Sequence, residues 1–343
     1  MARRTRYIPP GATVEVTSRT FQSRLLLRPL EILNIIILGI LGRAVEKYPL
    51  EIHAFTFMSN HYHLLLTVLS NLVLSEFMNH VNSKLAKEAG EIHDWHAKLW
   101  GRRYQAIPIL DDDALVGRLR YIMSHGCKEG LVADPEEWPG VTSLPALVHG
   151  KTLRGTWHNR TGEYRAKRRR KVIPPSDFTT NYEVPVSPIP CWSHLSPEEH
   201  QARCQSLLDE IKQETRETIQ RTGRQPLGRE WVLSQDPHSL PEKTKRSPAP
   251  LCHTTSPALH EQYVTQYRAF LESYREASTR FRAGELDVQF PPHSFPPPGP
   301  FVPAELDAPT GHPPRRTNAP MTIGAGDRTD RVDRSYTLYF SSG

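Results

Sequence analysis

The sequence predicts an α+β fold for its first half, an antiparallel sheet with helices on one side, followed by a helical, proline-rich extension. Two observations predict this. Segments with strand-like and helical patterns follow one another in the order β, α, β, β, α, β, α between residues 13 and 130. Most of the 31 prolines lie in the second half, where long polar helical patterns and extended segments replace the alternating strands.

The first four elements are predicted from local patterns. Residues 13–27 are rich in β-branched and apolar side chains with partial alternation, which predicts one strand and its exit. The apolar run over residues 30–41 continues as a helix that ends at Pro49. LEIHAFTFM and YHLLLTV then read as two strands around Ser59-Asn60, and so short a connection indicates an antiparallel hairpin.

The remaining elements of the first half complete the pattern. Helical spacing predicts a helix that Ser75 could cap and that Gly90 ends, and LWGRRYQAIPIL is the next strand candidate. Three carboxylates at residues 111–113 suit the start of a last helix that runs toward Gly130. This order of elements is related to the ferredoxin-like or RRM-like plan.

We expect four parts along the chain: a globular domain over residues 1–150, a basic linker over 151–175, a helical extension with a polyproline segment over 176–303, and a structureless tail over 304–343. Within the extension, Ser196-Pro197 and Ser256-Pro257 each combine a good cap with a good first helical residue, so each predicts a long helix. Aromatic residues at helical spacing in the second of these favour helix packing.

Composition excludes several classes of protein. The four cysteines have neither paired spacing nor a zinc-ribbon pattern, which favours free thiols over disulfides or a structural zinc site. The apolar run over residues 30–41 is too short to cross a membrane, which needs about 20 apolar residues. The basic N-terminus is not followed by an apolar core, so we expect no signal peptide and a cytoplasmic protein.

The positive charge is concentrated in one segment. Residues 151–175 carry a formal charge of +8, whereas residues 1–150 carry +1 and the remainder −3. This segment contains RAKRRRK, whose basic residues Arg165, Lys167, Arg168, Arg169, Arg170 and Lys171 favour phosphate binding through the release of counterions. A nucleic-acid partner is therefore predicted, with a solvated linker as the simpler alternative.

Two histidines lie one residue apart in the predicted second strand of the hairpin. His61 and His63 point to the same face, and Tyr62 points to the opposite one. Tyr121 and His125 are four residues apart and are expected on one face of the last helix. If that face packs over the histidine strand, a phenol and three imidazoles converge on one point. We expect His80, on the middle helix, to be solvated.

Such an arrangement can perform phosphoryl transfer. A divalent cation held by the imidazoles would polarise a phosphodiester, and a tyrosine oxygen in line could attack the phosphorus. The product is a phosphotyrosine ester, which conserves the energy needed to rejoin a strand without ATP.

These residues carry a family resemblance. MSNHYHLLL resembles the HUH motif of the single-tyrosine transposases, especially the REP-associated tyrosine transposases. TSRTFQSRLLL is similar to the first strand of that group, and residues 120–143, RYIMSHGCKEGLVADPEEWPGVTS, to its closing segment. The resemblance covers about residues 10–145, the predicted HUH domain, and leaves the extension unmatched.

The resemblance implies a metal-dependent single-stranded DNA endonuclease and strand transferase. It implies that His61 and His63 hold Mg²⁺ or Mn²⁺. His125 departs from the family pattern, in which Asn or Gln is common at this position; we expect its imidazole as a third metal ligand, which favours Mn²⁺ over Mg²⁺. Tyr121 is then the nucleophile. The partner is single-stranded or hairpin DNA, contacted first by Arg102, Arg103, Arg118 and Arg120 and further out by the basic run. Whether the protein forms a homodimer stays open.

Two other hypotheses remain. The chain could be a descendant that binds hairpin DNA or structured RNA without cutting, although three intact residues at the predicted site favour activity. A zinc hydrolase or zinc-bound structural protein is the third alternative. Nothing in the sequence resembles H-E-x-x-H or places a cysteine pair near the histidines, so this alternative has less support.

Overall fold

The computed structural model describes residues 5–169, 173–241, 249–292 and 294–299. Its main sheet has four antiparallel strands in the order β2-β3-β1-β4. The strands and helices of the first half are β1 (Thr13–Arg19), α1 (Glu31–Lys47), β2 (Leu50–Phe57), β3 (His61–Val68), α2 (Asn71–Ile92), β4 (Gln105–Pro108), α3 (Asp112–Met123), α4 (His125–Lys128) and α5 (Leu144–His149). The predicted α+β class and the β2–β3 hairpin are confirmed.

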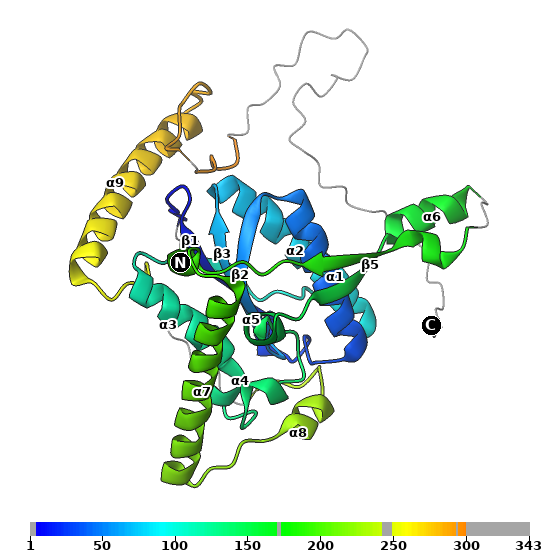
Figure 1. Ribbon diagram of the computed structural model, residues 1–343. Helices are drawn as coiled ribbons and strands as arrows, with labels where there is room; N and C mark the ends of the chain where they lie inside the picture. Colours follow the sequence, from blue (N-terminus) through cyan, green and yellow to red (C-terminus); the bar gives the residue numbers. More distant parts are fainter. Residues whose placement is uncertain (1–4, 170–172, 242–248, 293, 300–343) are drawn as a thin grey trace. The chain divides into compact units, whose positions relative to one another are not determined.

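Both faces of the sheet are covered, and every residue of β3 except Thr67 is buried. Tyr62, Leu64 and Leu66 join the core under α1 and α2. Leu65, on the other face, packs with Leu119 and other residues of α3. The expectation of helices on one side therefore holds for α1 and α2, whereas α3 covers the opposite face, as Figure 1 shows.

The segment predicted as one strand and its exit contains β1 up to Arg19 and then a 3₁₀ turn in which Gln22 and Ser23 adopt positive φ. One predicted boundary is wrong by a few residues. Helix α2 begins at Asn71 and is capped by Ser70, whose side chain accepts a hydrogen bond from Val73 N, so Ser75 lies inside the helix. Tertiary packing of Leu74 favours the earlier start.

Beyond residue 150 the described segments contain a two-stranded sheet and four α-helices: β5 (Leu153–His158), α6 (Arg160–Arg168), β6 (Thr179–Val184), α7 (Pro197–Thr222), α8 (Arg229–Ser234) and α9 (Pro257–Arg282). The two long helices start at the predicted caps, and Ser196 forms a full capping box with Glu199. Segment 151–175, expected as a linker, contains β5 and α6. The domain division stays a prediction, and its tail over 304–343 lies outside the described residues.

The second half packs directly on the first. Cys204, Leu208 and Ile211 of α7 join the core of α3 and α5. Tyr263 and Tyr267 of α9 contact Tyr7 near the N-terminus and donate hydrogen bonds to Tyr7 O and Thr5 O, which confirms the packing role of these aromatic residues. Residues 1–300 accordingly form one compact unit.

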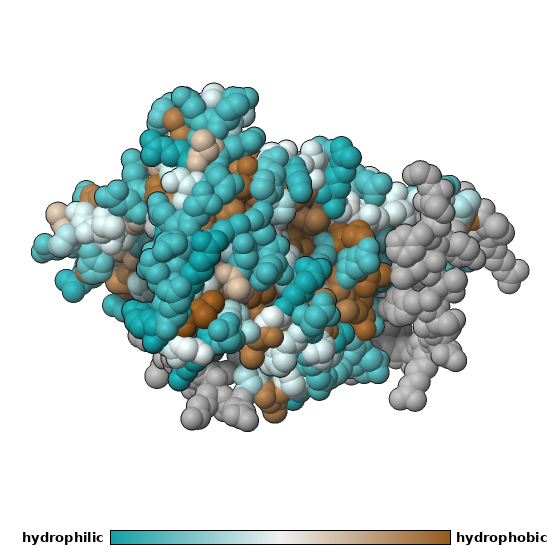
Figure 2. All heavy atoms as spheres, turned by 60° about the horizontal axis from the view of Figure 1, so that its bottom comes forward, coloured by the Kyte–Doolittle hydropathy of each residue, from teal (hydrophilic) through white to brown (hydrophobic). Residues whose placement is uncertain are grey.

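The polarity of the surface and the state of the cysteines agree with the expectations from composition. Figure 2 brings α7 and α8 toward the viewer and shows a mostly hydrophilic surface with hydrophobic residues in separate patches. All four cysteines are free thiols, as predicted. None of the helices in the described residues is long and apolar enough to cross a membrane.

The β5 strand crosses α1 at a pair of glycines. A Cβ on Gly39 would lie 2.2 Å from Thr156 O, and a Cβ on Gly155 would lie 2.1 Å from Gly39 N. Both distances are far below contact, so only glycine permits this approach. The position of β5 and of the residues that follow it depends on this crossing.

We expect Gly39→Ala to destabilise the protein by about 1–3 kcal/mol, because the new methyl group displaces β5 from α1. Gly117→Ala is the matched control: Gly117 is also helical, an added Cβ would have no atom within 4 Å, and the substitution should stabilise α3 by about 0.5–1 kcal/mol. Urea unfolding monitored by circular dichroism measures both. Equal stability of Gly39→Ala and wild type would contradict the crossing.

Candidate metal and nucleophile site

Three buried imidazoles meet on the α3 face of the sheet. Strand β3 directs His61 and His63 to this face, opposite Arg19 and Thr17 of β1. The first residue of α4, His125, completes the group. One ring nitrogen from each histidine lies within 4.8 Å of the others, and all three residues are at most 9% exposed. The structure thus brings together the three metal ligands that the sequence suggested, and their role stays a prediction.

One detail of the predicted last helix is wrong, because a break separates α3 from α4. Tyr121 and His125 were expected in one continuous helix, but α3 ends at Met123, Ser124 is its C-cap, and His125 opens α4. The two rings are nevertheless adjacent, with centroids 5.0 Å apart. Pairing at a spacing of four residues survives because Ser124 keeps right-handed helical dihedrals.

The Tyr121 ring lies beside the histidines and below two cations. Its centroid is 5.4 Å from that of His63. The guanidinium carbon of Arg118 is 3.9 Å and Lys128 Nζ is 4.3 Å from the Tyr121 centroid. Burial raises the pKa of Tyr121, and the charge and hydrogen bond of Arg118 oppose this increase without cancelling it. The phenol is therefore protonated near neutral pH, with a cation placed to stabilise a phenolate.

Hydrogen-bond acceptors orient two of the imidazoles. His61 Nδ1 lies 2.6 Å from Asn60 Oδ1, and His63 Nδ1 lies 2.7 Å from Glu15 Oε1. Because each oxygen accepts, each Nδ1 carries the hydrogen and each Nε2 keeps its lone pair for a ligand. The sequence-adjacent Asn60 and the distant Glu15 thereby fix the tautomer that metal binding requires.

Burial keeps the third imidazole, that of His125, and the imidazole of His61 neutral. His61 Nε2 lies 2.8 Å from His125 Nε2. Burial lowers the pKa of His125 to about 2, with the neighbouring charge of His63 as the next cause. Burial also lowers the pKa of His61 well below its ordinary value. Neutral imidazoles are the form that binds metal ions, so the residues fit a divalent cation.

Glu15 was missed by sequence reasoning. Its carboxylate is 2% exposed and contacts His63, Arg118 Nη2 at 2.6 Å, and His253 Nε2 at 2.8 Å. Burial raises the pKa of Glu15, but hydrogen bonds from His253 and His63 and the charge of Arg118 outweigh it and bring the pKa well below its usual range. One acidic residue inside the apolar strand TVEVTSR was the available indication.

The predicted DNA-contacting arginines fall into two groups. Arg118 forms an ion pair with Glu15. Arg120 lies 2.5 Å from Glu214 and 3.5 Å from Glu210, both on α7. Arg102 and Arg103 are exposed just before β4. Arg102 and Arg103 are therefore the more accessible candidates for binding DNA phosphates. This role stays a prediction for all four arginines.

The predicted outer basic run lies on α6 and beyond. Arg165, Lys167, Arg168 and Arg169 are exposed at the end of this helix, and Lys167 Nζ pairs with Glu163 at 2.6 Å. Arg170 and Lys171 lie outside the described residues. No residue of this run lines the histidine cluster within the part of the chain that the structure describes.

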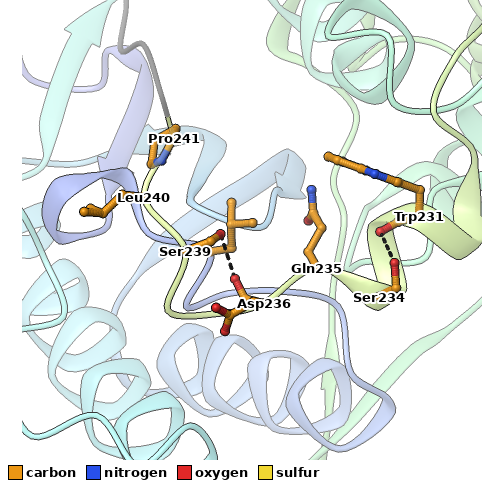
Figure 3. Close-up of a pocket in the computed structure, with 8 residues that line it drawn as sticks. Trp231, Ser234, Gln235, Asp236, Ser239, Leu240 and Pro241 are labelled. Carbon is orange, nitrogen blue, oxygen red and sulfur yellow. Dashed lines mark hydrogen bonds between the residues drawn. The ribbon is translucent and has the colours of Figure 1, made fainter.

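Two other polar features of the sequence have structural roles. Asp111 caps α3 by accepting a hydrogen bond from Ala114 N, which confirms that the acidic run serves the helix start. Tyr62 is fully buried on the other face and donates to Asn82 Oδ1. A hollow of about 530 Å³ between Trp231 and Pro241, shown in Figure 3, contains none of the predicted site residues.

Comparison with known proteins bears on this arrangement. Residues 31–125, which include His61, His63, Tyr121 and His125, match the model of the family described as "Transposase IS200 like". This segment is therefore similar to that family. A comparison with curated proteins finds no match.

Two solved transposase structures show partial similarity. One is a REP-associated tyrosine transposase bound to a REP hairpin, with 19% identity over 43% of this chain and 86% of that chain, at a TM-score of 0.37. The other is a candidate transposase from Deinococcus radiodurans R1, with 17% identity over 36% of this chain and 95% of that chain, at a TM-score of 0.26.

Replacing the carboxylate that orients His63 should weaken metal binding. For Glu15→Gln we expect Mn²⁺ affinity to fall about 10–100-fold, as is typical when an orienting partner of a ligand is removed. Calorimetric titration of Mn²⁺ measures the change. Glu88→Gln is the matched control, because Glu88 is also a buried carboxylate paired with an arginine but lies outside the histidine cluster. Equal losses in both variants would contradict the orienting role.

The cap of the Tyr121 helix should show a defined pH dependence. Slight burial raises the pKa of Asp111, but hydrogen bonds from Thr254, Ala114 and Thr255 outweigh it and lower the pKa to about 2. Because the folded pKa is below the unfolded one, this stabilisation is complete above the unfolded pKa and is lost as pH falls toward 2.

We expect Asp111→Ala to cost about 1 kcal/mol at neutral pH, in the range for a lost N-cap, with a smaller difference from wild type in acid. Asp112→Ala, one residue later and without a capping role, is the control. Thermal unfolding of the three proteins across this pH range gives the test. A difference that grows as pH falls would contradict the assigned sign.

Proposed function

We propose that the protein is a metal-dependent single-stranded DNA endonuclease and strand transferase of the transposase type, with Tyr121 as its nucleophile. The observation that carries this proposal is the convergence of His61, His63 and His125 within 4.8 Å, with the Tyr121 ring next to two of them. The match between the transposase family model and the segment that contains all four residues supports the same proposal.

The reaction follows from the positions of these residues. The Tyr121 oxygen attacks a DNA phosphorus and loses its proton to solvent; an O–P bond forms, the P–O3′ bond breaks, and the leaving oxygen takes a proton to give a free 3′-OH. The DNA is then held as a 5′-phosphotyrosine. Attack by another 3′-OH reverses the step and joins a new strand.

The three histidines would hold Mg²⁺ or Mn²⁺, which when bound polarises the phosphate and offsets the charge that develops on its oxygens. Mg²⁺ prefers oxygen donors, so three nitrogen donors favour Mn²⁺ of the two. Arg118, directly above the Tyr121 ring, would stabilise the phenolate that forms during attack.

The partner in this proposal is a DNA hairpin with single-stranded flanks, as the sequence resemblance implies. The exposed Arg102 and Arg103 and the basic end of α6 supply cations for its phosphates. A cytoplasmic location and a homodimer remain predictions from the sequence.

Covalent capture tests the proposal. We expect wild-type protein, incubated with an end-labelled DNA hairpin and Mn²⁺, to form an adduct that survives denaturing electrophoresis and is abolished by a chelator. Tyr121→Phe should form no adduct, because it lacks the attacking oxygen. Tyr164→Phe, which changes an exposed tyrosine away from the cluster, should behave as wild type.

The assay also separates the alternatives. Tight binding of the hairpin without an adduct, in either Mg²⁺ or Mn²⁺, would favour a non-catalytic binding protein. An adduct retained in Tyr121→Phe would show that another residue attacks the DNA, and the assignment of Tyr121 would be dropped.

A further inference from the structure

A basic cleft lies on the outer side of the α1–α2 layer, away from the histidine cluster. It has a volume of about 240 Å³ and is bounded by α1, α2, the end of β5 and the start of α6. Its lining includes Arg43, Lys47, Lys84, Lys87, Trp157 and Arg160. His61 and His63 point to the opposite face of the sheet, so this cleft is separate from the site described above.

The cleft has more positive charge than its own carboxylate can balance. Glu88 is bound by Arg160 through two hydrogen bonds, of 2.9 and 2.6 Å. Arg43, Lys47, Lys84 and Lys87 form no ion pair with a carboxylate among residues 5–169 and the other described segments. Burial lowers the pKa of Lys84, and the neighbouring charges of Lys87 and Arg43 lower it further, because the cations repel one another. A bound anion would reduce this repulsion.

Trp157 holds two of these cations in place. The guanidinium carbon of Arg43 is 4.5 Å and Lys84 Nζ is 5.4 Å from the Trp157 ring centroid. Both distances are in the range of cation–π attraction, which fixes the cations without neutralising them. The Trp157 indole N–H, which can only donate, has no acceptor in the described part of the chain.

His80 departs from the sequence expectation at this cleft. It was expected to be solvated, but it is 8% exposed and its ring lies 5.8 Å from that of Trp157. Burial, followed by the charges of Lys47 and Lys84, lowers the pKa of His80 to about 4. The imidazole is therefore neutral at physiological pH, and it supports Trp157 without adding to the charge.

The fold builds this cleft through the glycine crossing. Gly39 of α1 and Gly155 of β5 are in direct backbone contact, and Trp157 follows two residues later. Any side chain at the crossing would lift β5 and its tryptophan from α1. The position of Trp157 between cations of two helices is thus a consequence of close packing and not of a mobile surface chain.

The positive charge continues from the cleft along α6. Asn159, Arg160 and Thr161 line the cleft at the start of this helix, and Arg165, Arg168 and Arg169 are exposed toward its end. At 1.5 Å per residue the nine residues of α6 extend the charge by about 13 Å. A single phosphate would occupy only the cleft, whereas a polymer of phosphates matches its whole extent.

We infer that the α1–α2–β5 cleft and the adjoining basic side of α6 form a second nucleic-acid site, which binds the phosphate backbone of DNA outside the cutting site. Only the choice of DNA as the ligand rests on the proposed function. Lys47, Lys84 and Lys87 contact phosphates, and Arg43 and Trp157 position them. This site anchors one flank of the DNA, while another part of the same DNA reaches Tyr121 on the other face of the sheet.

Exposed lysines allow a test that spares the fold. We compare Lys47→Ala/Lys87→Ala with the control Arg216→Ala/Arg221→Ala, which removes the same charge from exposed positions of α7. Both changes are made in Tyr121→Phe protein, so that binding is measured without covalent capture. Circular dichroism and thermal unfolding verify that each variant is folded.

We expect the cleft variant to bind a fluorescein-labelled DNA hairpin with single-stranded flanks on the order of tenfold or more weakly at low salt. The slope of log K against log salt should fall in magnitude by roughly 1.4–1.8, as for two lost phosphate contacts, and the control should be nearly unchanged. Equal effects in the two variants would overturn the inference, whether or not wild-type protein forms the Tyr121 adduct.

Acetylation of lysines, read by mass spectrometry, locates the contact. The DNA hairpin should protect Lys47, Lys84 and Lys87 in protein with intact lysines, and leave Lys98 and Lys151 reactive. Absence of protection would overturn the inference. Protection by inorganic phosphate alone, with unchanged DNA affinity of the cleft variant, would identify a small-phosphate site and also overturn it.

Discussion

The buried carboxylate of Glu15 is the interaction on which the site depends. It joins four separate parts of the chain: its own strand β1, His63 on β3, Arg118 on α3 and His253 from the segment before α9. An unpaired carboxylate at this depth would be very unfavourable, so its three partners are held to it. Since Tyr121 lies one turn from Arg118, the same carboxylate sets the tyrosine helix against the histidine strand.

This dependence makes the second half of the chain part of the site. His253 pairs with Ile109 in a parallel bridge, and His253 N donates to Pro108 O, so the segment extends the edge of the sheet at β4. On the other side of α3, Glu210 and Glu214 of α7 bind Arg120. The helix that carries Tyr121 is thus held from both sides by residues beyond 150, so the extension helps to fix the position of Tyr121.

The sequence predicted those features that local patterns determine. Alternation placed His61 and His63 together, and helical spacing brought Tyr121 and His125 near each other even though Ser124 separates their helices. Glu15, His253 and the buried His80 could not be predicted in the same way. Each depends on a partner more than forty residues away in the sequence, or on burial by another element, and no local pattern specifies such contacts.

In the proposed cutting site, charge links metal binding to DNA binding. His61 and His125 are neutral, and Glu15 offsets the charge of Arg118, so a divalent cation would leave an excess of positive charge in a buried place. A phosphodiester is the natural counter-charge, and the free energies of the two binding events are then coupled and reciprocal. The outer basic cleft differs, because its cations are uncompensated from the start. In the proposed scheme, DNA binds there before any metal is present, and the resulting high local concentration of DNA phosphate favours completion of the metal site.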